Sequence, residues 1–331
     1  MSHYYDVFNG DADGLCALIQ LRQNTPRDAT LITGVKRDIS LLKQVQTEAG
    51  DQVTALDISM DKNATDLDRI LETGAKVFYV DHHFPGDIPE HANLHALINE
   101  APDTCTSILV NAHLKGEHSL WAIVGAFGDN LKKSARALAA KEDLSEQDIE
   151  LLEKLGIYIN YNGYGSNLED LHFTPQALYE KLLGYRNPLE FIRGNSPAGT
   201  PMDLSDFEKL EQGYQQDMAS AAAVEPITAT PNSAVFILPN EKWARRVSGV
   251  FSNDLANHNP DRAHAVLTEK TNGNYLVSVR APINRKTGAV DLCKQFPTGG
   301  GRAAAAGIND LPAGSLESFK RALEEAYAQS S

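Results

Sequence analysis

Short apolar runs alternate with longer amphipathic segments along the first half of the chain. Mostly apolar runs of strand length lie at residues 4–8, 30–35, 53–58 and 76–80. A helix-like segment at residues 14–23 follows the first run, and the alternation continues from there. Alternating strands and helices predict an α/β fold with a mostly parallel sheet that has helices on both faces.

The segment at residues 64–74 shows the helical period most clearly. Leu67, Ile70 and Leu71 fall at helical spacing. Gly74 is typical of the residue at which a helix stops. Two further apolar stretches are predicted to be helices, at residues 106–113 and 120–127.

Glycine, proline and polar residues divide the rest of the chain. Residues 145–156 are predicted to form a helix with Ser145 as its N-cap. Residues 158–166, which are rich in Tyr, Asn and Gly, are predicted to form a loop. The strongest break is at residues 193–201, and a helix-like segment follows at residues 204–224.

The last hundred or so residues predict a smaller C-terminal α/β domain. Its expected strands are residues 234–238 and 276–279, and its expected helices are residues 250–256 and 316–328. We therefore predict a first domain at residues 1–195, a linker with a connecting helix at 196–231, and a second domain at 232–331.

Composition agrees with two globular domains. A chain of 331 residues is longer than one hydrophobic core usually serves, and 42% hydrophobic with 22% charged residues is typical of a soluble protein. We find no apolar stretch of membrane-spanning length and no opening secretory signal. Three widely spaced cysteines without a CxxC pair suit buried thiols in a reducing compartment, which predicts a cytoplasmic location.

The net charge of −14 limits the partners of the protein. Binding to long nucleic acid depends on many neutralised phosphates, so long duplexes are not expected to bind. A short phosphorylated ligand in a local cationic pocket stays compatible with this charge. Carboxylates that hold metal would cancel part of it.

Carboxylates follow two of the apolar runs. Asp11 and Asp13 lie on a turn with glycine on both sides, and Asp57 closes the third run. Taken alone, each aspartate is explained at least as well by a turn or a helix cap. Because ligands gather at the carboxyl ends of parallel strands, the alternative interpretation is a shared metal site.

The stretch Asp81-His82-His83 is the most informative in the chain. An apolar run ends here in one carboxylate and two imidazoles, which suit divalent metals. Consecutive histidines after a strand point to opposite sides, so one can bind metal while the other meets substrate. Asp81 can orient a ligand. The alternative is a pair of half-exposed histidines. Asp129, which follows the apolar stretch at residues 120–127, is likewise either a metal ligand or an aspartate at the end of a helix.

A glycine-rich segment lies far downstream. Gly299, Gly300 and Gly301 precede Arg302 and a run of alanines that predicts a helix start. Exposed backbone N–H groups ahead of a helix form an anion-binding nest, and Arg302 adds a guanidinium for phosphate. Arg280 ends a strand and can point at the same phosphate. The alternatives are a flexible loop and a surface arginine.

In this order and spacing, the segments resemble the DHH phosphoesterase superfamily in its two-domain form. The Asp-x-Asp-Gly turn, the lone Asp57, Asp81-His82-His83 and the Gly-x-x-Gly-Asp element that ends at Asp129 match the four motifs of its catalytic domain. Arg280 and the three glycines match its DHH-associated C-terminal domain. The resemblance covers nearly the whole chain.

The resemblance implies a hydrolase with two divalent ions, usually Mn²⁺, with Mg²⁺ or Co²⁺ as alternatives. Asp11 and Asp57 would bind one ion. The other ion would have as ligands Asp13, Asp57, His82 and Asp129, with Asp57 bridging.

The resemblance also implies roles around the substrate. His83 would contact the scissile phosphate, with Asp81 as its neighbour. Substrate would lie between the domains, where Arg280, the three glycines and Arg302 would hold its far end.

Two positions depart from the family pattern. Relatives often carry a histidine or a further aspartate just before the Asp-x-Asp pair, where this chain has Asn9, so the first ion would be held more weakly or by water. The glycine-rich motif usually continues with histidine. Here Arg302 takes that place; it cannot shuttle protons at working pH, but it can bind a terminal phosphate.

The leading functional hypothesis is a phosphodiesterase that cleaves short oligonucleotides, above all linear 5′-phosphorylated dinucleotides, to mononucleotides. One alternative is a phosphatase acting on polyphosphate, pyrophosphate or a nucleoside bisphosphate. Another is a nucleotide-binding regulator without turnover. The sequence predicts no membrane partner and leaves base preference, cleavage direction, metal identity and the choice between monomer and homodimer open.

Overall fold

The apolar runs of the first half form one parallel sheet in this computed structural model, which describes residues 2–194 and 205–328. The strands are β1 (Tyr4–Phe8), β2 (Thr30–Ile32), β3 (Gln52–Leu56), β4 (Lys76–Asp81) and β5 (Leu94–Ile98). They lie in the order β2-β1-β3-β4-β5. Phe8 pairs with Leu56, and Leu56 with Val80, so the carboxyl ends of β1, β3 and β4 lie level.

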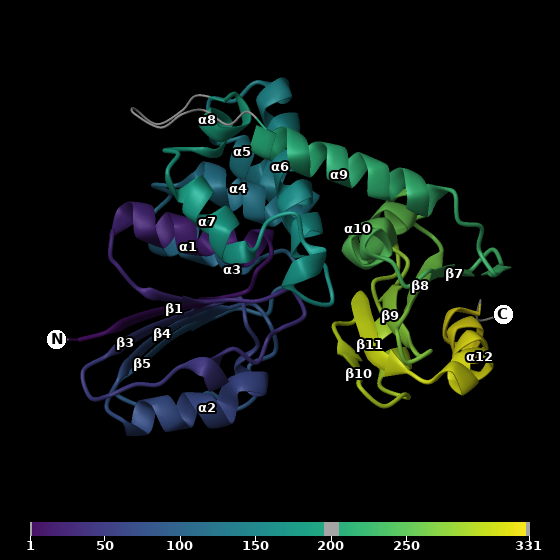
Figure 1. The fold of residues 1–331 in the computed structure, drawn as a ribbon, viewed down its shortest axis with the longest axis horizontal. Helices are drawn as coiled ribbons and strands as arrows, with labels where there is room; N and C mark the ends of the chain where they lie inside the picture. The colour runs from purple at the N-terminus through teal and green to yellow at the C-terminus, as the bar shows by residue number, and fades with distance from the viewer. Residues whose placement is uncertain (1, 195–204, 329–331) are drawn as a thin grey trace. The chain divides into compact units, whose positions relative to one another are not determined.

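Helices lie on both faces of this sheet (Figure 1). α2 (Met60–Glu72) packs against β4 on one face, with its predicted apolar stripe buried. On the other face lie α1 (Ala12–Asn24) and α3 (Thr106–His113), and α4 (Ser119–Gly128) packs against α1. The predicted α/β fold with a parallel sheet and helices on both faces is confirmed.

The remaining elements that the structure describes around this sheet are two short 3-10 helices and four α-helices, of which α6 is the longest. They are η1 (Leu42–Gln44), α5 (Lys132–Ala139), α6 (Glu146–Gly163), η2 (Leu168–Asp170), α7 (Pro175–Leu183) and α8 (Pro188–Ile192). Ser145 is the N-cap of α6, as predicted, and forms a capping box with Asp148.

The loop predicted at residues 158–166 is wrong over most of its length, because α6 continues to Gly163. Its last residues are buried despite their weak helix propensity. Asn162 donates to the carbonyl oxygen of Phe173 at 2.8 Å and accepts from the N–H groups of His172 and Phe173. Tertiary hydrogen bonds therefore hold in helix a stretch whose composition is typical of a loop.

The chain divides into two compact units, Met1–Glu211 and Gln212–Ser331. α9 (Ser205–Ala222) runs across the division and agrees with the predicted connecting helix. The predicted break at residues 193–201 lies mostly outside the described residues, and the linker boundaries stay a prediction. No helix in the described part of the chain has the length and apolar character to cross a membrane.

The second unit contains a mixed sheet in the order β10-β11-β9-β8-β7-β6. Its strands are β6 (Thr228–Ala229), β7 (Ser233–Leu238), β8 (Ala263–Glu269), β9 (Tyr275–Arg280), β10 (Gly299–Gly301) and β11 (Ala305–Leu311). Its helices are α10 (Lys242–His258), α11 (Ala289–Cys293), the short η3 (Ala313–Ser315) and α12 (Leu316–Tyr327). β7 and β8 are parallel, and the other pairs are antiparallel.

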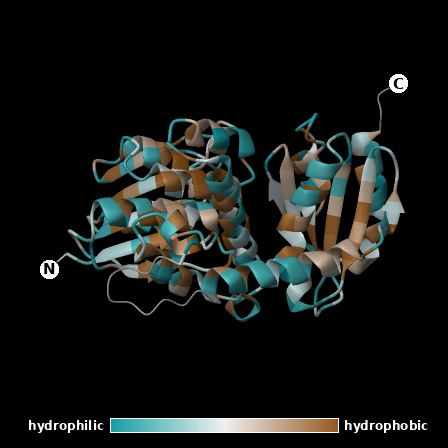
Figure 2. Ribbon diagram, turned by 90° about the horizontal axis from the view of Figure 1, so that it is seen from above, coloured by the Kyte–Doolittle hydropathy of each residue, from teal (hydrophilic) through white to brown (hydrophobic). Residues whose placement is uncertain are grey.

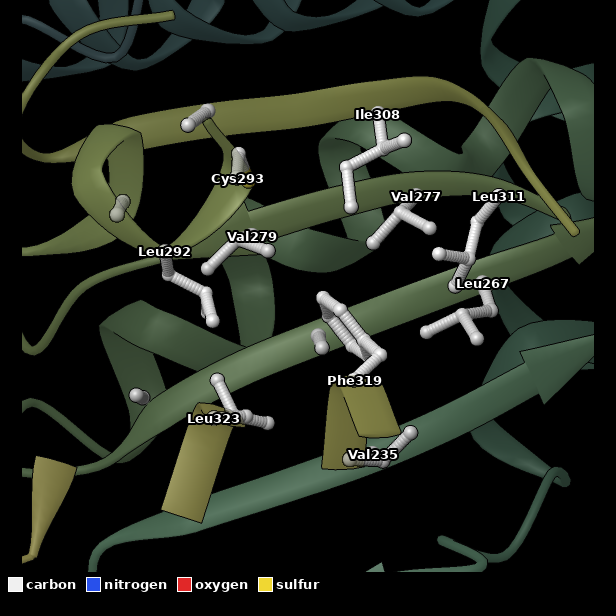
Figure 3. Close-up of a cluster of buried hydrophobic side chains, with 14 of the residues drawn as sticks. Val235, Leu267, Val277, Val279, Leu292, Cys293, Ile308, Leu311, Phe319 and Leu323 are labelled. Atoms are coloured by element: carbon white, nitrogen blue, oxygen red, sulfur yellow. The ribbon is translucent and has the colours of Figure 1, made fainter. Parts of the chain in front are cut away.

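One face of this sheet forms the core of the second unit. Phe319 and Leu323 of α12 lie against strand residues such as Val235 and Val277 (Figure 3). The strands are correspondingly rich in hydrophobic residues (Figure 2). α10 packs against β8 and β9, where Arg280 donates to Asn253.

The helix start predicted after the three glycines is wrong. β10 and β11 form an antiparallel hairpin, in which Gly301 pairs with Ala306 and the N–H of Arg302 donates to the carbonyl oxygen of Ala305 at 2.8 Å. Ala306 and Ile308 belong to the buried core, and β11 pairs with β9 along its length. An anion nest with a helix dipole behind it is therefore not formed here.

Candidate metal centre

The level carboxyl ends of β1, β3 and β4 carry the predicted ligands. Asp13 lies in the first turn of α1 after β1, Asp57 follows β3, and His82 follows β4. Asp129 directly follows α4 and reaches the same edge of the sheet. The fold thus gathers side chains that are up to 116 positions apart in the sequence, as Asp13 and Asp129 are.

Two groups of side chains among the described residues have the spacing of metal ligands. One is Asp13, His82 and Asp129, and the other is Asp57, His82 and His83; within each group the ligand atoms lie within 4.8 Å of one another. The Nε2 atom of His82 lies 3.5 Å from Asp57 Oδ1, 3.6 Å from Asp129 Oδ2 and 3.9 Å from Asp13 Oδ2. His82 is therefore the centre of the cluster.

The tautomer of His82 is fixed by a backbone contact. Its Nδ1 atom lies 3.1 Å from the carbonyl oxygen of Thr104, which can only accept, so Nδ1 carries the proton and donates. This leaves the lone pair of Nε2 directed at the carboxylates. Orientation of a ligating histidine by a carbonyl oxygen is a common feature of metal sites.

The N-terminus of α3 holds Asp13 in place. The backbone N–H groups of Thr106 and Ser107 each donate to one Asp13 oxygen at 2.8 Å, and Thr106 Oγ1 donates to Asp57 Oδ1 at 3.2 Å. Sequence reasoning missed Thr104, Thr106 and Ser107. The only feature of the sequence that could have indicated them is that they are small polar residues at or just before the start of the helix predicted at residues 106–113.

The second histidine has a different environment. His82 has only 2% of its side chain exposed, whereas His83 has 32%. His83 Nδ1 lies 2.7 Å from Asp81 Oδ1, and this carboxylate is fully buried. Within the part of the chain that the structure describes, Asp81 Oδ2 has no hydrogen-bond partner. Asp81 thus fixes the His83 ring while the ring edge reaches solvent.

The electrostatics of the cluster suit a cation. Burial raises the pKa of Asp57 well above its ordinary value, and the neighbouring carboxylates Asp11, Asp13 and Asp129 raise it further. Asp57 also has a backbone φ of 59°, in the left-handed region. A divalent ion would remove this repulsion, so the donor set of carboxylates and an oriented imidazole fits Mn²⁺.

Asp11 contacts the start of α1 and a lysine, and its predicted role as a metal ligand stays a prediction. Its Oδ1 accepts from the N–H groups of Asp13 and Gly14 at 3.0 and 3.1 Å, and its Oδ2 accepts from the Lys36 ammonium. Asp11 belongs to neither metal-suitable group among the described residues. Burial is the strongest single influence and raises the pKa of Asp11. The charge and hydrogen bond of Lys36, together with the hydrogen bond from Gly14, outweigh burial, and the pKa lies below its ordinary value.

Sequence reasoning also missed Lys36. The lysine follows β2 and carries no motif, and its contacts with Asp11 and Asn160 join residues 25 and 124 positions apart. Burial is the strongest single influence and would lower the pKa of Lys36. The charges of Asp11, Tyr164 and Asp129, together with the hydrogen bond to Asp11, outweigh burial and raise the pKa of the lysine.

The predicted substrate-binding residues lie together in the second unit. Arg280 at the end of β9 pairs with Ala305 of β11, and β11 pairs with the strand Gly299–Gly301. Arg280 Nε donates to Asn253 Oδ1 at 2.6 Å, and Arg302 is exposed. Their role toward a substrate, and that of Gly299, Gly300 and Gly301, stays a prediction.

Comparison with known proteins identifies the fold. The exonuclease RecJ bound to manganese matches with a TM-score of 0.61 and 18% identity over 99% of this chain and 90% of that chain. The DHH domain of a member of a ribosomal protein family matches with 0.62 and 14% over 99% and 87%. The pGpG-specific phosphodiesterase PggH from Vibrio cholerae matches with 0.54 and 14% over 99% of each chain.

The chain therefore has the fold of the DHH phosphoesterases, and the resemblance stated from the sequence is confirmed at the level of fold. No family model and no curated protein sequence matches the chain.

Proposed function

We propose that the chain is a metal-dependent phosphodiesterase that hydrolyses short phosphorylated oligonucleotides in the cytoplasm. The observation that carries this proposal is the cluster of Asp13, Asp57 and Asp129 around the oriented Nε2 atom of His82. The DHH fold supports it, because structural neighbours with this fold include a manganese-bound exonuclease and a phosphodiesterase.

We further propose linear 5′-phosphorylated dinucleotides as the substrate. A neighbour that aligns with the whole length of the chain is a pGpG-specific phosphodiesterase. The net charge of −14 disfavours long polymers, as argued from the sequence. Arg280, Arg302 and the glycines of β10 would hold the terminal phosphate.

The chemistry divides between metal and protein. A bound divalent ion would lower the pKa of a bound water and neutralise charge on the phosphoryl oxygens. Asp13, Asp57, Asp129 and His82 would hold this ion, with Asp13 fixed by the N-terminus of α3.

His83 would act on the substrate directly. Because its Nδ1 atom is paired with Asp81, the remaining ring nitrogen is the one that can reach a phosphoryl oxygen. The buried Asp81 carboxylate also stabilises a positive charge on this ring. His83 would therefore stabilise negative charge that develops during displacement.

A product assay tests the proposal. Purified protein with Mn²⁺ is incubated with pGpG, with pApA and with inorganic polyphosphate, and the products are separated by chromatography. We expect mononucleotides from the dinucleotides and no reaction in EDTA or with Asp57→Asn. Release of orthophosphate alone would favour the phosphatase, and tight nucleotide binding without any product would favour the regulator.

A further inference from the structure

Lys36 contacts Asp11, one of the two aspartates to which the family resemblance assigns the first metal ion. Its ammonium donates to the Asp11 carboxylate and, at 2.9 Å, to Asn160 Oδ1. It lies 3.7 Å from Asp129 Oδ1. The cationic group beside Asp11 is therefore a side chain of the protein itself.

The backbone on both sides of this lysine is anchored. The Lys36 N–H donates to the carbonyl oxygen of Gly163 at 2.8 Å, and its own carbonyl oxygen accepts from Asn9 Nδ2 at 3.2 Å. The ammonium also lies 5.4 Å from the centre of the Tyr164 ring, a favourable cation–π distance. Contacts from the β1 turn and from the end of α6 thus direct the side chain into the cluster.

Both oxygens of the Asp11 carboxylate already accept hydrogen bonds in this arrangement. One of its oxygens caps α1 through two N–H groups, and the other accepts from Lys36. An ammonium and a divalent cation on the same carboxylate oxygen would also repel each other. Asn9, which stands near the place of a histidine in relatives, binds the Lys36 backbone instead.

We propose that the Lys36 ammonium is a built-in replacement for one of the two metal ions. The chain then binds a single divalent ion, on Asp13, Asp57, His82 and Asp129, and Lys36 supplies the second positive charge beside it. This inference rests on the proposed metal-dependent function but concerns the number of ions and not the substrate.

Metal counting tests the inference without reference to activity. Full-length protein is dialysed to equilibrium against Mn²⁺ at low and high concentration, and bound manganese is measured per chain by elemental analysis. Electron paramagnetic resonance then distinguishes an isolated Mn²⁺ from a coupled pair. We expect one ion with an uncoupled spectrum in the wild type, and two ions with a coupled spectrum in Lys36→Met.

Two further variants complete the experiment. Lys36→Arg keeps the positive charge and is expected to bind one ion, and Lys133→Met removes an exposed lysine of α5 and is expected to match the wild type. Circular dichroism establishes that each variant is folded. Two ions in the wild type, or one ion in a folded Lys36→Met, would overturn the assignment. A wild type that binds no manganese would overturn the proposed function as well.

Discussion

At the scale of single residues, Asp81 and His83 connect the buried edge of the first sheet with solvent. Asp81 is fully buried, and one of its oxygens is used by His83 Nδ1 at 2.7 Å. The carboxylate does not need to touch substrate to matter, because it selects the nitrogen that His83 presents. Loss of an outer partner of this kind typically costs 10–100-fold in activity or metal affinity.

Asp81→Asn tests this positioning role. The amide keeps the shape but loses the charge that stabilises a positive His83 ring, so we expect kcat to fall by about 10–100-fold. Mn²⁺ affinity is expected to stay within about threefold, because His82 and the carboxylates are untouched. The measurement is kcat and KM on a dinucleotide with a parallel Mn²⁺ titration. A loss of metal affinity that accounts for the whole effect would contradict the role.

At the scale of elements, close helix packing positions Asp129. α4 approaches α1 and α6 through glycines, and a Cβ atom on Gly128 would lie 2.3 Å from Ala12 Cβ and 3.0 Å from the Gly156 carbonyl oxygen. The residue that follows is Asp129, so the same contact that packs the helices also sets the position of a candidate metal ligand.

Gly128→Ala is therefore expected to disturb both stability and metal binding. The additional methyl overpacks the helix contact, which typically costs about 1–3 kcal/mol of unfolding free energy. Urea denaturation and Mn²⁺ titration measure the two effects. Gly314→Ala is the matched control, because its methyl meets no atom within 4 Å and its φ lies outside the left-handed region. Equal effects of the two substitutions would refute the packing argument.

The elements also show how far sequence reasoning reaches. Strands β1 to β4 of the first sheet and the cap at Ser145 were predictable, because apolar runs and capping residues are local signals, whereas β5 was not predicted. The β10–β11 hairpin was not, since glycine and alanine have no strand pattern and the hairpin is fixed by pairing with β9. Lys36 and Thr104 could not be predicted for the same reason, because each joins the site through contacts with distant parts of the chain.

At the scale of the whole molecule, the two units offer independent spectroscopic probes. The chain has two tryptophans, Trp121 in the first unit and Trp243 in the second. Single Trp→Phe variants therefore report the unfolding of each unit separately. The candidate metal ligands all belong to the first unit.

Mn²⁺ is expected to stabilise the first unit selectively. A ligand at 100 times its Kd adds about 2.7 kcal/mol to the unit that binds it. Thermal unfolding followed through Trp121, in a Trp243→Phe chain, should shift upward with Mn²⁺, whereas the signal of Trp243 in Trp121→Phe should not. Equal shifts of both signals would contradict a metal centre confined to the first unit.

The second unit is expected to lose stability in acid through His264. Burial, aided by Arg262, lowers the pKa of His264 from 6.5 to about 4. Between these values the unfolded chain binds more protons, so stability is complete above about pH 6.5 and falls as pH drops to 4, by at most about 3 kcal/mol. His264→Leu should flatten this dependence in urea denaturation followed through Trp243. An unchanged slope would contradict it.

The left-handed backbone at Asp57 has a consequence for how the sequence can diverge. With φ at 59°, the position disfavours alanine and, more strongly, valine or isoleucine, whatever is bound nearby. A descendant without the proposed activity would be free to lose the charge of this aspartate but not the backbone conformation. We expect such a descendant to carry asparagine or glycine at position 57. Its relation to the active protein would then still be recognisable from this residue.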